Sequence, residues 1–188
     1  MLSPGQGHVS VRLARQSIEE HLGLQVTAPV STEELTSPFL LQQCGVFVTI
    51  HKQGALRGCI GSLTSKEPVR EGIRRQAVNS ALYDHRFNPV REEELADLQI
   101  EVSVLSVPEE LNYTDADELV ELLRPGIDGV IITSPAGKSA TFLPQVWKQL
   151  PEPVAFLKHL CRKAGLADNF WKKGQLSVKT YTVQCFEE

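Results

Sequence analysis

A cysteine between two glycines, closely preceded by an arginine, is the segment whose residue types could do chemistry. Arg57, Gly58, Cys59 and Gly61 stand in the segment LRGCIG, at the end of a predicted strand and shortly before a predicted helix. Glycine lets the backbone approach a ligand, amides at a helix start attract anions, and a guanidinium suits a carboxylate or phosphate. The same positive charge would stabilise a thiolate. The segment therefore predicts an anion-binding loop with a reactive thiol, or a strand end that needs small residues for close packing.

A second polar cluster, DHRF, directly follows the helix predicted over 67–83. His85 could act as an acid or base near neutral pH, Asp84 could orient it or hold Arg86, and Arg86 could bind an anion. The alternative is that His85 and Arg86 cap the carbonyl end of the helix, where positive charge is favourable.

Glu101 lies within an alternating strand pattern, on the face opposite the apolar residues. If that face lines a cleft, Glu101 becomes a general base or a partner for Arg57; otherwise it is solvated. The sequence cannot establish that these segments meet in space. The candidate catalytic residues are therefore Cys59, Glu101 and Asp84, and the candidate ligand-binding residues are Arg57, Gly58, Gly61 and Arg86.

The other cysteines, Cys44, Cys161 and Cys185, sit in apolar patterns and are predicted to be core residues. No Cys-x-x-Cys pair and no histidine at zinc-finger spacing occurs, so we expect no metal site. The first ten residues lack the apolar segment of a signal peptide, and no run of 18 apolar residues occurs. We therefore expect a cytoplasmic protein with reduced thiols and no membrane span.

Composition places the chain among ordinary globular proteins, with 188 residues, 41% hydrophobic and 22% charged. Nineteen basic residues against 23 acidic ones give a net charge of −4, without a long basic run. A nucleic-acid partner is therefore not favoured.

Periodicity and turn residues predict an α+β protein with a mixed, mostly antiparallel sheet and helices packed on it. Thr114 and Asp117 resemble a capping box at a helix start. The predicted helices are 11–22, 67–83, 114–123 and 154–164, the predicted strands are 44–52, 55–60, 100–104, 129–133, 139–143 and 178–186, and 29–38 is predicted as a loop. One domain is expected, with boundaries of a smaller lobe near 88–94 and 125–126.

Several stretches in the same order give the chain a resemblance to the AMMECR-type domain family, whose bacterial and archaeal members are called AmmeMemoRadiSam system protein A. The stretches that carry the resemblance are Leu56–Gly61 (LRGCIG), Ser80–Phe87 (SALYDHRF), Ile100–Leu105 (IEVSVL), Phe142–Val146 (FLPQV) and Phe156–Leu166 (FLKHLCRKAGL). Together they span most of the chain from Leu35 to the C-terminus.

The resemblance implies two subdomains with a cleft between them, and LRGCIG facing that cleft. It implies Memo-like and radical SAM proteins as partners, and no particular cofactor. The positions it carries over are Arg57, Gly58, Cys59, Gly61, Asp84, Arg86 and Glu101. In many relatives the positions of His85 and Asn88 look like proline, so a role for the His85 imidazole would be peculiar to this chain.

Two functions remain open on this basis. The first is an enzyme acting on a small anionic ligand, with Cys59 as nucleophile and Glu101 or Asp84 moving a proton. The second is a non-catalytic module that binds an anionic ligand or a partner protein through Arg57 and the glycine segment.

Overall fold

The computed structural model describes residues 3–64, 66–173 and 175–188, which fall into two compact units. Unit 1 comprises residues 1–105 and 184–188, and unit 2 comprises residues 106–183. Each unit has its own four-stranded sheet and its own hydrophobic core, which confirms the α+β class. The segment 88–94 lies inside unit 1 and the turn at 125–126 lies inside unit 2.

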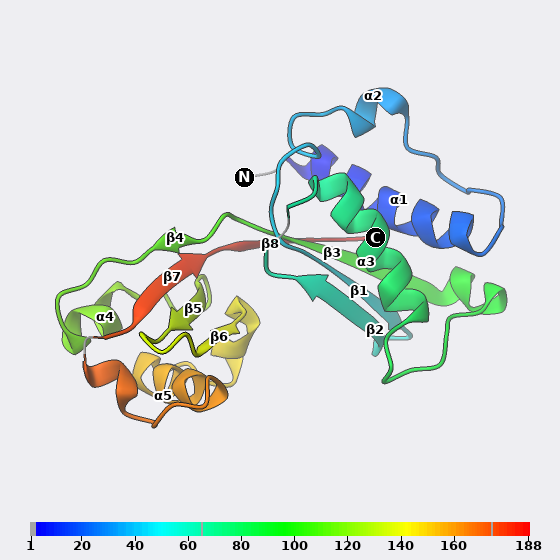
Figure 1. Ribbon diagram of the computed structural model, residues 1–188. Helices are drawn as coiled ribbons and strands as arrows, with labels where there is room; N and C mark the ends of the chain where they lie inside the picture. Colours follow the sequence, from blue (N-terminus) through cyan, green and yellow to red (C-terminus); the bar gives the residue numbers. More distant parts are fainter. Residues whose placement is uncertain (1–2, 65, 174) are drawn as a thin grey trace. The chain divides into compact units, whose positions relative to one another are not determined.

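The sheet of unit 1 has the strand order β2-β1-β3-β8, with β2 at one edge (Figure 1). These strands are β1 (Val46–Lys52), β2 (Ala55–Ser62), β3 (Leu98–Leu105) and β8 (Val183–Glu187). Strand β1 pairs antiparallel with both β2 and β3. Gln53 and Gly54 separate the predicted strands 44–52 and 55–60 and form the turn between β1 and β2. Their φ values are 52° and 77°, as a two-residue hairpin turn requires.

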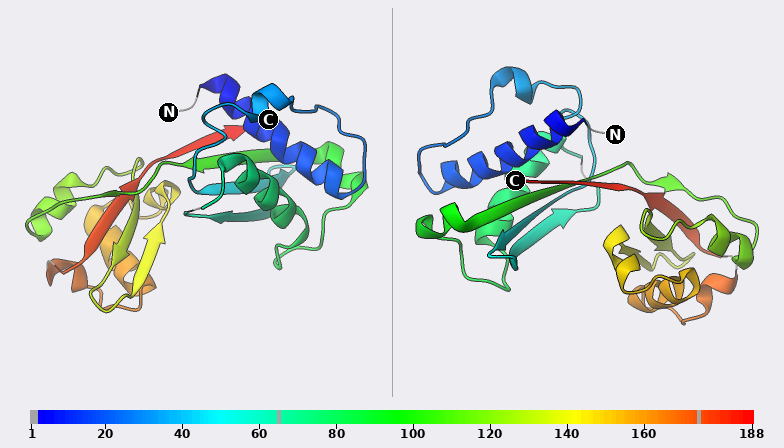
Figure 2. Two further views of the ribbon diagram at one scale, coloured as in Figure 1. Left: turned by 45° about the horizontal axis from the view of Figure 1, so that its top comes forward. Right: turned by 180° about the vertical axis from the view of Figure 1, so that it is seen from behind.

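Helices α1 (Pro4–His21) and α3 (Val69–Leu82) lie side by side over one face of this sheet, as both views of Figure 2 show. Helix α1 begins at Pro4 rather than at Val11. The hydroxyl of Ser3 accepts a hydrogen bond from the Gln6 amide, while the Gln6 side chain accepts one from the Ser3 amide.

A similar capping box produces the short helix α2 (Thr32–Leu35), inside the segment 29–38 that was predicted to be a loop. The Glu34 amide donates to the Ser31 hydroxyl, and the Ser31 amide donates to Glu34. The prediction was wrong there because the two prolines outweighed this four-residue signal.

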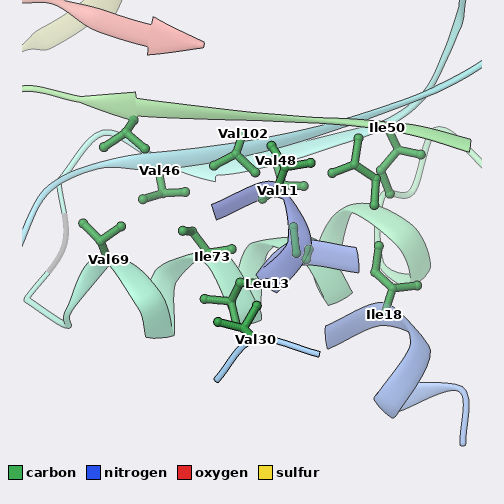
Figure 3. Packing of buried hydrophobic residues seen from close by; sticks show 14 of the residues in the cluster. Val11, Leu13, Ile18, Val30, Val46, Val48, Ile50, Val69, Ile73 and Val102 are labelled. Carbon is green, nitrogen blue, oxygen red and sulfur yellow. The ribbon is translucent and has the colours of Figure 1, made fainter. Parts of the chain in front are cut away.

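The core of unit 1 forms where alternate residues of the strands meet the apolar stripes of the two helices. Val48 and Ile50 of β1 are fully buried, as are Leu13 of α1 and Ile73 of α3. Figure 3 shows these side chains facing one another across the interface between sheet and helices. The opposite face of the sheet carries the other strand residues, among them Thr49 and Cys59.

The sheet of unit 2 has the order β4-β7-β5-β6. Its elements are β4 (Glu109–Glu110), α4 (Ala116–Leu122), β5 (Gly129–Thr133), β6 (Ser139–Phe142), α5 (Pro153–Lys163) and β7 (Ser177–Tyr181). Short 3-10 helices cover Glu92–Asp97 in unit 1, and Pro144–Lys148 and Phe170–Lys173 in unit 2. In the core of unit 2 the Trp147 ring stacks on Phe156 with 3.7 Å between centroids.

Three further predictions outside the candidate site are corrected. The strand predicted over 178–186 divides into β7 and β8, which belong to different sheets. The cap of α4 is Asp115, whose carboxylate accepts from the amides of Asp117 and Glu118, so the Thr114–Asp117 box does not form.

The third correction concerns Cys185. Cys185 is exposed because it lies on β8, an edge strand of the sheet of unit 1. Cys44 and Cys161 are buried as predicted. None of the four cysteines, all of which lie in the described part of the chain, forms a disulfide bond. Among the described residues, no helix combines the length and the apolar character needed to cross a membrane.

Candidate functional site

The LRGCIG segment is part of strand β2 and is not a loop after a strand. Helix α3 begins only at Val69, so the amides of a helix start do not follow directly on Cys59. The glycines have packing partners within the chain. A Cβ on Gly58 would lie 2.1 Å from the Ser80 carbonyl oxygen, and one on Gly61 would lie 2.2 Å from the Phe47 ring. Close packing therefore accounts for both glycines without a ligand.

Asp84 and Arg86 close the edge of β2 at Cys59. The Cys59 amide donates to Asp84 Oδ2 at 2.9 Å, and the Cys59 carbonyl accepts from Arg86 Nη2 at 3.1 Å. Arg86 also grips the Asp84 carboxylate through Nε at 2.9 Å and Nη2 at 2.7 Å. Both main-chain polar groups of Cys59 are thus satisfied by the DHRF segment, as a neighbouring strand would satisfy them.

The carboxylate of Asp84 is buried, with 6% of its side chain exposed. The hydrogen bonds from the Arg86 side chain, reinforced by the Cys59 amide, hold its pKa well below the usual range despite burial. In turn, the hydrogen bond to Asp84 raises the pKa of Arg86. An aspartate held in this way is suited to fixing Cys59 and Arg86, and poorly suited to exchanging a proton near neutral pH.

Sequence reasoning did not single out Ser80, which joins helix α3 to the same part of β2. Its buried hydroxyl accepts from the Ile60 amide at 2.9 Å and donates to the Val48 carbonyl at 2.7 Å. The hydroxyl therefore bridges the β1–β2 ladder. The available signal was its position seven residues after Ile73, which places a serine on the buried face of the helix.

Arg57 occupies an irregularity in β2. Ile50 pairs with Gly58 and His51 pairs with Leu56, so Arg57 has no partner in the β1 register. Such a bulge re-aims the side chain. Arg57 donates through Nε and Nη2 to Glu94 at 3.1 and 3.0 Å. The carboxylate partner of Arg57 is thus Glu94, and not Glu101 as one hypothesis had it.

The segment 88–94 is fastened to β2 by this ion pair. Arg57 Nη1 also donates to the Asn88 carbonyl at 2.8 Å, and Lys52 Nζ donates to Glu94 at 3.0 Å. The hydrogen bonds from Arg57, with those from Lys52 and the Arg91 amide, lower the pKa of Glu94 to about 2. Glu94 was not predicted to take part, because its role depends on a contact between residues far apart in the sequence.

Next to these contacts lies a surface hollow of about 630 Å³, entirely within unit 1. It is lined by Arg57, Arg86, Phe87, Asn88, Pro89, Arg91, Glu93 and Glu94. The Arg86 side chain is 56% exposed, and its Nη1 group has no hydrogen bond among the described residues. The Arg91 side chain has no ion pair in the described part of the chain. Two guanidinium groups can therefore meet a ligand here.

Cys59 lies on the sheet face opposite the helices and does not line this hollow. The Thr49 hydroxyl lies 3.3 Å from Cys59 Sγ and can donate a hydrogen bond to it. Thr49 pairs with Cys59 on one side and with Glu101 on the other, so Thr49 stands between the two candidate catalytic groups. Glu101 accepts a hydrogen bond from the Ser103 hydroxyl at 3.2 Å.

His85 is exposed and takes no part in these hydrogen bonds. Asp84 holds Arg86 and not the imidazole, which is one of the two arrangements that the sequence left open. Arg86 binds Asp84 and the Cys59 carbonyl instead of the last carbonyls of α3. Within the described residues, no group of three or more His, Cys, Asp and Glu side chains is arranged to hold a metal ion.

Fold and site define an α+β protein of two units, one of which carries an arginine-lined hollow beside a clamped LRGCIG strand. The sequence model of the AMMECR1 family matches residues 11–186. The chain belongs to the AMMECR1 family.

Archaeal relatives match the chain over nearly its whole length. A protein of Thermofilum pendens is 36% identical over 202 residues, which cover 100% of this chain and 92% of the relative. Protein PH0010 of Pyrococcus horikoshii is 39% identical over 192 residues, which cover 97% of this chain and 89% of the relative. The crystal structure of that uncharacterized protein matches with a TM-score of 0.79, covering 100% of this chain and 93% of the other.

Proposed function

We propose that this protein binds a small ligand through an anionic group, carboxylate or phosphate, in the hollow beside β2. The observation that carries the proposal is the state of Arg86. Asp84 fixes its guanidinium through Nε and Nη2, while Nη1 remains available at the hollow. A guanidinium held in place in advance loses little side-chain freedom on binding and offers planar donors to an oxyanion.

Arg57 fixes the 88–94 segment that forms part of the site. Its side chain is 15% exposed, and its guanidinium donates to Glu94 and to the Asn88 carbonyl, so it fixes the wall of the hollow. Arg91 is exposed and lines the same hollow, where it supplies a second cation. A cleft between the two subdomains and partnership with Memo-like and radical SAM proteins stay predictions.

Isothermal titration calorimetry with inorganic phosphate and with acetate tests the proposal. We expect saturable binding that Arg91→Ala weakens by about fivefold, the effect of losing one exposed ion pair of about 1 kcal/mol. Arg86→Lys, which keeps the charge but loses the fork, should weaken it as well. Arg74→Ala removes the same charge on α3 outside this hollow and should change nothing.

Cys59→Ser should leave anion binding unchanged, because Cys59 does not line the hollow. Absence of saturable binding by either anion, or equal weakening by Arg74→Ala and Arg91→Ala, would refute the proposal.

A thiol enzyme is the second candidate function, favoured by the hydroxyl of Thr49 beside Cys59 Sγ. A donor to sulfur stabilises the thiolate that acts as a nucleophile. Glu101 would then accept a proton, while Asp84 would position the Cys59 main chain.

Alkylation by iodoacetamide, read at the Cys59 peptide by mass spectrometry, tests this second function. Peptide resolution is needed because Cys59 is half-buried, whereas Cys185 is exposed and would react too. Thr49→Val should slow alkylation of Cys59 at neutral pH and Thr49→Ser should restore it. Equal rates in all three proteins would remove the argument for a reactive thiol.

A further inference from the structure

The charges that line the hollow are not all of one sign, and this bears on the ligand. Three arginines, Arg57, Arg86 and Arg91, face two glutamates, Glu93 and Glu94. A site for a plain anion gains nothing from carboxylates in its wall, because they repel the ligand. Whether each glutamate is occupied within the protein therefore matters.

Glu94 is fully engaged. It receives hydrogen bonds from Arg57, Lys52 and the Arg91 amide, so its charge is compensated within the protein. Asp84 likewise compensates Arg86, although from the side away from Nη1.

Glu93 differs from Glu94 in this respect. It is exposed, lines the hollow, and has no ion pair or hydrogen bond of its side chain within the described residues. The Arg91 side chain, two positions earlier, likewise has no ion pair within the described residues. Among the described residues, the hollow thus presents unpaired charges of both signs, at Arg91 and at Glu93, beside the Nη1 donors of Arg86.

An apolar surface accompanies them. The Phe87 ring is half-buried, lines the hollow, and lies 5.4 Å from the guanidinium carbon of Arg86. A ligand with a short hydrocarbon chain between its charged ends could lie against this ring. The volume of about 630 Å³ leaves room for a molecule of several carbon atoms.

From these observations we infer that the ligand is a small zwitterion, in which an anionic group meets Arg86 and Arg91 and a protonated amine meets Glu93. The inference rests on the proposed function and adds to it a cationic group in the ligand. The amine supplies the partner that Glu93 lacks among the described residues.

Two matched pairs of probes test the inference by calorimetry. The carboxylate pair is 5-aminovalerate and valerate, and the phosphate pair is phosphoethanolamine and ethyl phosphate. In each pair only the first compound carries an amine. We expect the amine to tighten binding by about twofold to fivefold, as one exposed ion pair does. Comparison of the pairs tells which anionic group is preferred.

Two glutamine variants then locate the effect. Glu93→Gln should abolish the preference for the amine-bearing probe, while Glu92→Gln should retain it. Glu92 is an exposed neighbour that does not line the hollow, so its substitution changes the net charge equally. Both substitutions affect solvent-exposed side chains, and both proteins should fold normally.

The outcomes separate the inference from the proposed function. If valerate and ethyl phosphate bind, and Arg91→Ala weakens them, but the amine makes no difference, only the zwitterion is refuted. Equal effects of Glu92→Gln and Glu93→Gln would also refute it, because the effect would then be one of net charge. If no probe binds, the hollow is not an anion site and both proposals fail.

Discussion

At the scale of single residues, the charged side chains of the DHRF and LRGCIG segments are held by partners within the protein. Asp84 accepts from Arg86 and from the Cys59 amide, and Arg57 is paired with Glu94. Of the candidate residues, Arg86 alone combines a fixed guanidinium with free donors at the hollow. Residue types typical of catalysis thus serve here first to fix the edge of a sheet.

The buried carboxylate of Asp84 should be essential for stability. In Asp84→Asn the amide cannot accept from Arg86 and Cys59 as the carboxylate does, so we expect a loss of about 2–3 kcal/mol in the free energy of unfolding. Urea denaturation measures this loss. His85→Ala, one position away and exposed, should stay within about 0.5 kcal/mol of the wild type. Equal stability of Asp84→Asn and the wild type would contradict a stabilising role for the hydrogen bonds that Asp84 accepts.

The ion pair of Glu94 should make stability depend on acid. Its pKa in the folded protein is lowered to about 2 from an ordinary value of 4.5, by the Arg57 bond above all. The stabilisation is therefore fully present above pH 4.5 and is lost as the pH falls towards 2. Glu94→Gln should be about 1 kcal/mol less stable at pH 7, and this difference should shrink below pH 4.5. Denaturation at several pH values checks this, and a difference independent of pH would be inconsistent with it.

At the scale of elements, helix α3 and strand β2 meet through contacts that leave no space for larger side chains. The Ser80 carbonyl lies against Gly58 and its hydroxyl bridges Ile60 and Val48. This contact fixes how the C-terminal end of α3, and hence Asp84, meets the edge of the sheet.

Gly58→Ala should disturb that contact. Its Cβ would lie 2.1 Å from a backbone oxygen, which cannot move away as a flexible side chain can. We expect a loss of about 1–3 kcal/mol in the free energy of unfolding. Gly5→Ala is the matched control, since nothing lies within 4 Å of its Cβ in helix α1, and it should be neutral or slightly stabilising. A neutral Gly58→Ala in thermal denaturation would show that α3 does not pack so closely.

At the scale of the whole molecule, the chain leaves unit 1 after β3, forms unit 2, and returns to complete the sheet of unit 1 with β8. The returning segment is fastened by Glu188, which pairs with Arg15 and accepts from the Ile100 amide. Phe186 packs on Gly7 of α1.

Deletion of residues 184–188 should therefore weaken unit 1 and leave unit 2 intact. Both tryptophans, Trp147 and Trp171, lie in the core of unit 2, so their fluorescence reports on that unit. We expect the urea midpoint by fluorescence to stay close to that of the wild type, while the midpoint by far-UV circular dichroism falls for the helices of unit 1. An equal fall in both midpoints would mean that the units do not unfold separately.

The α+β class, the strands predicted over 44–52 and 55–60 and the helix predicted over 67–83 followed from the sequence, because periodicity and turn residues act over a few positions. The family followed as well, from segments that keep their order along the chain. The partners of the candidate residues did not. Contacts between distant segments decide that Arg57 binds Glu94 and that Ser80 bridges two strands. They also decide that residues 178–186 divide between two sheets. Only tertiary packing brings those segments together, and local propensity carries no information about which side chains then meet.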